Sequence, residues 1–370
     1  AAFVVARAGD APAYLVPQSD AASKHEAKLS DPALARLARV LLSATFLSGA
    51  FSFVYEIGWV RMLNQALGTT IHSFELMLAA FIAGLAFGGL WIRQRGASIR
   101  DVIAYAGYAQ VAMGVAALLS VLALANSFTW VGWLLAALAR TDNGYTLYSA
   151  GSAAIALLVM FPAAFFAGMT LPLFTMALLR AGADERAIGR IYAANTLGAI
   201  IGVFAVVHVL IPLIGVRLSV TVAALGDAVL GFYLLRAISP ARATPGYAVA
   251  ALVTLAAVAI SMIGGKPDPR AQASGVFRHG RAELPMDSQV AYLRDGKTAT
   301  ISLTVFPEER IASIATNGKP DAALALTLDD APTSDEATMI ELAALPLALH
   351  AKPENVAVIG WGSGLTVHSL

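Results

Sequence analysis

Three glycines alternate with other residues near the C-terminal end of the sequence, in the stretch GWGSG at 360–364. They follow the apolar run Val356–Ile359, which is typical of a strand buried in a parallel sheet. Glycine lets a backbone approach a ligand closely, and a helix that follows offers unpaired N–H groups and the positive end of its dipole. We therefore predict a nucleotide-type cofactor site in this turn. Its residues are Gly360, Gly362, Ser363 and Gly364.

Two other interpretations of this turn stay open. Dinucleotide-binding folds favour the spacing G-x-G-x-x-G, and Leu365 stands where the third glycine is expected, so a nicotinamide cofactor fits less well. A tight connection between a strand and a helix also uses glycines when no ligand binds. The six histidines show no spacing typical of metal ligands, so the sequence predicts no metal site.

Composition indicates that most of the chain lies in a membrane. Of the 370 residues, 58% are hydrophobic and only 13% are charged, whereas an ordinary soluble domain has about 25% charged residues. The lipid bilayer is therefore an expected partner. A formal net charge of +1 argues against nucleic acid as another. The absence of cysteine excludes disulfides, thiolate metal sites and cysteine nucleophiles.

Apolar runs long enough to cross a bilayer, for which about 20 residues are needed, recur along the chain. We predict about seven transmembrane helices, near 40–63, 72–92, 102–125, 149–179, 191–213, 217–236 and 247–264. The run 128–139 is too short to span and carries Trp130 and Trp133, so an interfacial or re-entrant helix is expected there.

After residue 265 the composition becomes that of a soluble protein. We divide the chain into an N-terminal lead-in (1–39), a multi-pass transmembrane region (40–265) and a partial soluble domain (266–370). Alternating residues and the dipeptides Asp295-Gly296 and Asn317-Gly318 predict strands and hairpins, and a helix is expected over 335–350. The predicted fold class is an all-α membrane region followed by the incomplete start of an α/β domain. We expect the rest of that domain either to have been cleaved off or to lie in a longer polypeptide.

Basic residues in short loops predict the orientation. With seven spans, the lysines and arginines gather on the side of the N-terminus, whereas the short loops of the other side carry Arg140 and Arg217. We therefore expect the N-terminus in the cytoplasm. An odd number of spans then puts the soluble part on the opposite side of the membrane.

Polar residues inside the predicted spans are further candidates for chemistry, because a charge in the bilayer is costly and by default marks a functional site. Tyr55, Glu56 and Arg61 lie near the end of the first span, where Arg61 is also able to reach the interface. The remaining candidates are Glu75, Asn195 and Asp227, together with His72 and His208. An interhelical hydrogen bond or an interface position is the plainer explanation for each.

Small residues four apart form smooth faces on two spans, Ala80-Gly84-Gly88 and Ala194-Gly198-Gly202. Such faces pack closely, either within the chain or on another membrane subunit. Pro162 and Pro172 predict a kink or an unwound turn in the fourth span. Broken helices line the sites of transporters, so a small-solute transporter is one alternative function, and an accessory or scaffold subunit of a membrane complex is another.

Several stretches carry a family resemblance. They are YLRDGKTATISL, TNGKPDAALA and DDAPTSDEATMIELAALPLALHAKPENVAVIGWGSG in the soluble part, and FLSGAFSFVYEIGWVRMLNQALGTT, LAAFIAGLAFGGL, FPAAFFAGMTLPLF and GRIYAANTLGAIIG in the membrane part. Together they resemble the spermidine synthase family, in particular bacterial proteins in which a multi-pass membrane region precedes such a domain. The resemblance covers about residues 43–370. It implies a bacterial inner-membrane protein whose soluble part begins with β-hairpins, a helix and a first Rossmann-like strand.

The resemblance also implies an activity, the transfer of an aminopropyl group from decarboxylated S-adenosylmethionine to a polyamine. The glycine turn would hold that cofactor or S-adenosylmethionine, and carboxylates would hold the cationic substrate. Candidates for this role are Asp335, Glu336 and Glu341, for which a solvated helix face is the alternative. Met339 and Ile340 stand where soluble members commonly carry Tyr-His, and Ser363 where they often carry an acid, so no catalytic residue is assigned.

Overall fold

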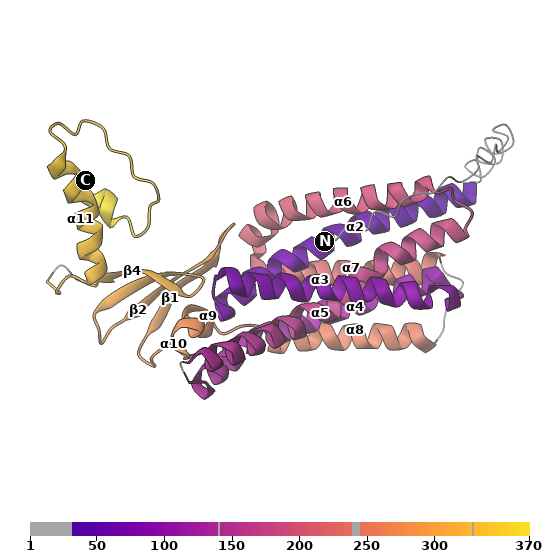
Figure 1. The fold of residues 1–370 in the computed structure, drawn as a ribbon, viewed down its shortest axis with the longest axis horizontal. Helices are drawn as coiled ribbons and strands as arrows, with labels where there is room; N and C mark the ends of the chain where they lie inside the picture. The colour runs from indigo at the N-terminus through magenta and orange to yellow at the C-terminus, as the bar shows by residue number, and fades with distance from the viewer. Residues whose placement is uncertain (1–31, 140, 239–244, 328) are drawn as a thin grey trace, which may run out of the picture.

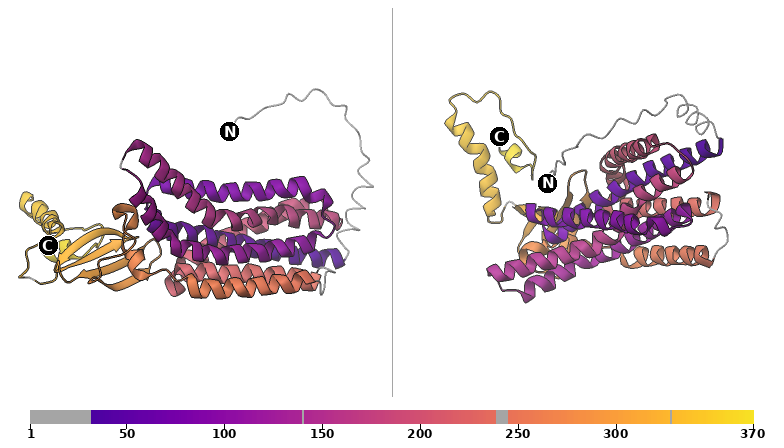
Figure 2. Two further views of the ribbon diagram at one scale, coloured as in Figure 1. Left: turned by 90° about the horizontal axis from the view of Figure 1, so that it is seen from below. Right: turned by 45° about the vertical axis from the view of Figure 1, so that its right-hand side comes forward.

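The structure, a computed structural model, describes residues 32–139, 141–238, 245–327 and 329–370. A bundle of long helices is followed by a small antiparallel sheet at one end of the bundle (Figures 1 and 2). The sheet and the start of α2 lie at opposite ends of the molecule. Of the predicted lead-in, only residues 32–39 are described, and they form the first turns of α2.

The long helices of the described chain are α2 (Pro32–Leu67), α3 (Ile71–Arg95), α4 (Val102–Ala137), α5 (Asp142–Arg180), α6 (Arg186–Ala205), α7 (Ile211–Tyr233) and α8 (Pro245–Gly264). A short 3₁₀-helix, η1 (Gly96–Ser98), and two short π-helices, η2 (Val206–Leu210) and η3 (Leu234–Ile238), adjoin them. In the part of the chain that the structure describes, six stretches are long and apolar enough to cross a membrane. One of them, Arg186–Arg236, has 51 residues and contains both α6 and α7.

This long stretch reverses direction at Gly215, whose backbone is not helical (φ 79°, ψ 169°). The contacts with α2 show the reversal. Gly198 and Gly202 of α6 lie against Phe46 and Ala50, so these two helices run parallel. On α7, the contacts of Val220 with Gly58 and of Gly226 with Phe51 run in the opposite order along α2, which makes α7 antiparallel to it.

One prediction about the membrane region is wrong, and of the two alternatives for the fourth span, a kink or an unwound turn, the second is excluded. The run 128–139 is not a separate interfacial helix, because α4 continues without a break to Ala137. The fourth span is not unwound at its prolines, because α5 is helical through both Pro162 and Pro172. Inside an apolar environment a backbone keeps its own hydrogen bonds wherever it can, and the close packing of α5 on α3 holds the helix through the prolines.

Both small-residue faces pack inside this chain. A Cβ on Gly88 would lie 2.0 Å from the carbonyl oxygen of Phe165 on α5. A Cβ on Gly198 would lie 1.9 Å from the carbonyl oxygen of Phe46 on α2. Any larger residue would force these helices apart, so the two faces are filled by neighbouring helices of the same bundle.

The sheet has four antiparallel strands in the order β1 (Gln289–Asp295), β2 (Thr300–Phe306), β3 (Ile311–Thr316) and β4 (Lys319–Ala325). The first three lie where alternation predicts them. Asn317 and Gly318 both have positive φ, which suits the tight turn between β3 and β4. The alternation of apolar and polar residues did not predict β4, because Pro320 and Asp321 are residue types that are rare in strands. They are tolerated here because β4 lies at the edge of the sheet.

Short helices complete the soluble part. The helices α9 (Pro269–Ala273) and α10 (Val276–His279) lie between the bundle and the sheet, and α11 (Ser334–Leu349) and α12 (Leu365–Ser369) follow it. The prediction of a strand at Val356–Ile359 is wrong, because this segment has no regular secondary structure and pairs with no strand among the described residues. A strand forms only beside a neighbour that accepts its hydrogen bonds. Here Ile359 is fully exposed instead.

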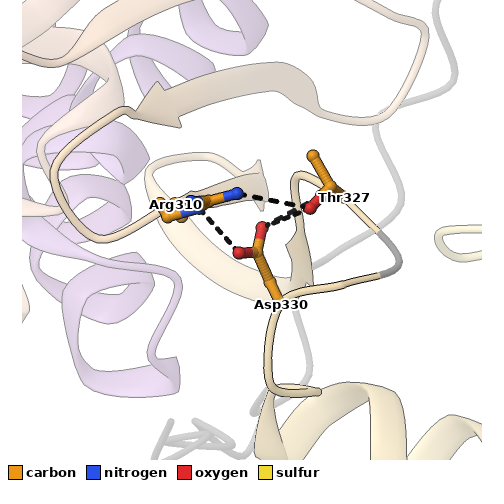
Figure 3. A network of polar contacts seen from close by, with 3 residues as sticks. All are labelled: Arg310, Thr327 and Asp330. Atoms are coloured by element: carbon orange, nitrogen blue, oxygen red, sulfur yellow. Dashed lines mark hydrogen bonds and ion pairs between the residues drawn. The ribbon is translucent and has the colours of Figure 1, made fainter.

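A network of three side chains closes the sheet at the end that leads to α11 (Figure 3). Nε of Arg310, in the turn between β2 and β3, lies 2.6 Å from Oδ1 of Asp330. The other carboxylate oxygen accepts hydrogen bonds from the backbone N–H and the hydroxyl of Thr327, at 3.1 and 2.9 Å. Partial burial raises the pKa of Asp330, but the bonds from Thr327 and Arg310 outweigh it, so this pKa lies below its usual value.

Replacing Asp330 by Asn should loosen this loop near neutral pH, because the substitution removes the charge that Arg310 and Thr327 hold. We expect faster amide hydrogen exchange at Leu326 and Thr327, measured by mass spectrometry. The matched control is Asp329→Asn, an exposed neighbour with no side-chain hydrogen bond among the described residues. It should leave both amides unchanged.

The pH dependence of this difference follows from the lowered pKa. A carboxyl whose pKa falls on folding stabilises the protein above its unfolded pKa of about 3.9, and this contribution is lost as the pH drops through the folded value. The parent and Asp330→Asn should therefore converge once the pH falls below the folded pKa of Asp330. A difference of undiminished size at that pH would contradict the assignment.

Candidate functional site

The glycine turn has a backbone that favours glycine at all three positions. The φ angles are 96° at Gly360, 55° at Gly362 and 85° at Gly364, a region that side chains with a Cβ rarely adopt. A Cβ added at Gly360 or Gly362 would meet no atom within 4 Å. Open space therefore lies beside the backbone at these two glycines.

The turn is held against α11 through a single methionine. The hydroxyl of Ser363 lies 2.9 Å from Sδ of Met339, and the hydroxyl of Thr366 donates to the carbonyl oxygen of Met339 at 3.0 Å. Ser363 also accepts a bond from the backbone N–H of Leu365. Ser363 and Thr366 thus position the turn on the middle of α11.

The acidic residues of α11 have different surroundings. Asp335 accepts a hydrogen bond from the backbone N–H of Ala323 in β4 at 2.8 Å. Glu336 caps the helix, because its Oε2 accepts from the backbone N–H of Thr333 at 2.7 Å. Both lie three or four residues before Met339, so they share the helix face that holds the turn. Their role toward a substrate stays a prediction.

Glu341 lies elsewhere on this helix. Its side chain is exposed and makes no hydrogen bond within the described residues. Because it is two residues from Met339, it points about 200° away from the face that contacts the turn. The structure therefore does not bring Glu341 together with the glycines.

Within the bundle, the structure brings together two of the predicted polar residues. The hydroxyl of Tyr55 on α2 donates to Oδ2 of Asp227 on α7 at 2.5 Å, and both side chains are buried. Oδ1 of Asp227 has no hydrogen-bond partner among the described residues. The ring of Tyr55 stacks on Trp59, whose indole N–H donates to Ser120 of α4 at 2.7 Å. These bonds link α2, α4 and α7, as interhelical hydrogen bonds do.

The other intramembrane candidates lie apart from this pair. Glu56 is half-buried and has no polar partner in the described part of the chain. Glu75 faces His72 at 3.6 Å on an exposed turn of α3, where such a pair contributes little. Asn195 packs against Gly49, and His208 is exposed and stacks on Phe204.

Sequence reasoning missed the polar junction between the bundle and the sheet. Oδ2 of Asp295, at the end of β1, accepts a hydrogen bond from the backbone N–H of Val216 at 2.8 Å. The break at Gly215 frees this N–H, so Asp295 caps the helix that restarts there. Oδ1 of Asp295 accepts from the hydroxyl of Thr300 at 2.6 Å. The dipeptide Asp295-Gly296 signalled a turn, but nothing in the sequence signalled a partner 79 residues away.

The end of α2 binds the same hairpin. Nη1 of Arg61 donates to the carbonyl oxygens of Gly296 and Lys297 at 3.1 and 2.9 Å. Gln65, one turn further on, donates to the hydroxyl of Thr300 at 2.8 Å. Arg61 is only 7% exposed, and its position relative to the membrane interface stays a prediction. Its guanidinium holds the sheet on the bundle.

Comparison with known proteins gives a distant similarity. No protein-family model and no solved structure matches the chain. Three curated proteins named polyamine aminopropyltransferase, from two strains of Mycobacterium tuberculosis and from Mycobacterium bovis, are each 29% identical over 285 residues. The match covers 73% of this chain and 48% of each relative, so the chain spans about half the length of the curated relatives it matches. The matched share exceeds the whole soluble part, so the similarity extends into the helices.

Asp295→Ala should weaken the junction between the sheet and the bundle. The substitution removes a helix cap, which typically costs about 0.5–2 kcal/mol, and it leaves the N–H of Val216 without its partner. We expect a lower melting temperature in detergent and faster amide exchange at Val216 and in the hairpin at 296–299. The exchange can be measured by mass spectrometry on the purified protein.

The matched control for this change is Asp321→Ala. Asp321 is also an aspartate of the sheet, in β4, but its carboxylate is exposed and among the described residues meets only Lys319, at 3.5 Å. It should change neither measurement. Equal protection of Val216 in the two variants would show that Asp295 does not hold the helix break.

Proposed function

We propose that this chain is a membrane-anchored, spermidine synthase-like protein, in which the helical bundle carries an aminopropyltransferase-type domain. The observation that carries this proposal is the similarity to polyamine aminopropyltransferases, because it includes helices as well as soluble sequence. The bare backbone at Gly360 and Gly362 supports it, since a nucleotide-type cofactor needs close approach to such a turn.

The residues of this chain fit one edge of a site for decarboxylated S-adenosylmethionine, which when bound supplies the aminopropyl group. Gly360, Gly362 and Gly364 offer backbone with open space beside it, and Ser363 fixes the turn on α11. Asp335 and Glu336 share that face of the helix, where their negative charge suits a polyamine. A polyamine nitrogen attacks only after it loses its proton, so an acceptor for that proton belongs to the same site.

The bundle is proposed to cross the inner membrane of a bacterium seven times. The stretch Arg186–Arg236 is long enough for two crossings of about 20 residues, and its reversal at Gly215 separates them. Seven crossings put the sheet on the side opposite the start of α2. The surplus of arginines at the α2 end favours that end as the cytoplasmic one.

This orientation favours a second candidate function, an accessory or scaffold subunit of a membrane complex. Cofactors of the S-adenosylmethionine type belong to the cytoplasm, whereas the arginines favour the opposite side for the sheet. The polar contacts inside the bundle agree with a structural role, because they tie helices to one another. A small-solute transporter stays an alternative, but α5 shows no unwound turn at Pro162 or Pro172 that would favour it.

Aminopropyl transfer is tested with the purified full-length protein, putrescine and decarboxylated S-adenosylmethionine, by mass spectrometry of the products. We expect spermidine to form, and Gly360→Val to lower kcat/KM by about tenfold or more. A valine there occupies the open space and strains a backbone with positive φ. Gly189→Ala on α6 is the control, because a Cβ there meets nothing within 4 Å. No product from the well-folded parent would refute the enzymatic function.

The side of the sheet separates the two candidate functions. The chain has no cysteine, so Glu308→Cys in the exposed turn between β2 and β3 is a unique label. Ala97→Cys marks the other end of the bundle. From the arginine distribution we expect an impermeant maleimide to label intact cells at residue 308 and not at residue 97. The reverse pattern would overturn this orientation and place the glycine turn in the cytoplasm with its cofactor.

A further inference from the structure

An apolar groove of about 720 Å³ runs between α2 and α7 on the outside of the bundle. From α2 it is lined by Val40, Ser43, Leu47 and Phe51, and from α7 by Val229 and Tyr233. Its floor is closed, because Ala44 and Leu230 beneath it are buried. Since the bundle has the composition of a membrane domain, the groove opens toward lipid.

The groove has the length of one leaflet. It extends along α2 from Arg36 to Phe51, which is about 22 Å at the rise of an α-helix. Half of the hydrocarbon core of a bilayer is about 15 Å thick, so the remainder reaches the headgroup region. The groove ends where the ring of Phe51 occupies the space beside Gly226; a Cβ there would lie 2.5 Å from the ring.

Positive charge is confined to the open end of the groove. Arg36 and Arg39 line it there, and both are exposed. Neither makes an ion pair or a side-chain hydrogen bond with another described residue. Tyr233, on the opposite wall, is 47% exposed, and tyrosine commonly sits at the level of lipid headgroups. The groove therefore has an apolar body and a cationic mouth.

A smaller hollow adjoins this mouth on the other side of α2. Its volume is about 240 Å³, and Arg39 lines it together with Leu42, Leu178 and Arg190. Arg39 lines both spaces, and the hollow also contains one acidic residue, Asp184, so the charged residues that line the two spaces are three arginines and one aspartate. Arginine holds phosphate oxygens through paired N–H donors, so this corner of the bundle suits a phosphodiester better than a neutral headgroup.

We propose that the groove between α2 and α7 binds one anionic glycerophospholipid of the leaflet at the α2 end. One acyl chain lies along Ser43, Leu47 and Phe51, and the phosphate lies between Arg36 and Arg39. The match of length to a single leaflet, and of charge to phosphate, favours a lipid over a transmembrane helix, which would cross both leaflets and present no anion.

The test uses the purified full chain in detergent, titrated with dioleoyl phosphatidylglycerol or dioleoyl phosphatidylcholine. Bound lipid is counted by native mass spectrometry. Arg36→Gln with Arg39→Gln removes the cationic mouth. The matched control, Arg93→Gln with Arg100→Gln, removes the same charge from exposed residues at the same end of the bundle. Ser43→Trp fills the groove and leaves every charge in place.

We expect the parent to prefer phosphatidylglycerol by about tenfold or more, since each basic residue near an anionic headgroup contributes on the order of a fivefold change in affinity. The Arg36/Arg39 variant should lose this preference, and the control should keep it. Ser43→Trp should lower the retention of both lipids. Equal retention of the two lipids by the parent would indicate unselective annular lipid and overturn the proposal.

Two further outcomes also count against the site. An equal loss in the Arg93/Arg100 control would assign the preference to the general surface charge. Full lipid retention in Ser43→Trp would show that the lipid binds outside the groove. Dimerisation by the parent that Ser43→Trp abolishes would identify a second copy as the occupant.

Discussion

The hydrogen bond from the backbone N–H of Val216 to the carboxylate of Asp295 is the contact on which the two halves of this protein depend. A helix that breaks beside a bilayer leaves backbone groups without partners, and each one is costly unless something else bonds to it. Gly215 makes the reversal between α6 and α7 possible, and the sheet supplies the acceptor that it requires. Arg61 and Gln65 attach the same hairpin to α2. The composition of the chain changes at residue 265, but hydrogen bonds across this boundary hold the two parts together.

The sequence reveals elements whose signal is local. Long apolar runs predict the helices, and Asn317-Gly318 predicts the hairpin, because a few adjacent residues decide each one. The predictions that are wrong depend on distant parts of the chain. The ending of α4 depends on what packs beside it, the strand at Val356–Ile359 needs a neighbour, and β4 forms at an edge that β3 provides. The role of Asp295 was invisible for the same reason.

The polar residues of the bundle show why residue type alone does not identify a site. Tyr55, Glu56 and Asp227 are equally unusual in an apolar helix, and the sequence ranks them alike. Packing separates them, since Tyr55 and Asp227 bond to each other in the core, whereas Glu56 lies half-buried without a polar partner among the described residues. Arg61, which the sequence placed near the end of its span, donates to the hairpin of the sheet. The direction in which each side chain points is set by the neighbouring helix.

The position of the glycine turn is determined by a series of contacts that begins at the membrane. Asp295 fixes β1 to the helix break, the antiparallel ladder carries that position from β1 to β4, and Asp335 bonds α11 to β4 through Ala323. Met339 then holds Ser363 and the turn. Each step is a hydrogen bond or a strand pairing. A change in the backbone at Gly215 is therefore able to shift the proposed cofactor site through these contacts. The bundle thereby acts on the turn as a positioning element in addition to anchoring it, and this holds whether the soluble part serves as an enzyme or as a scaffold.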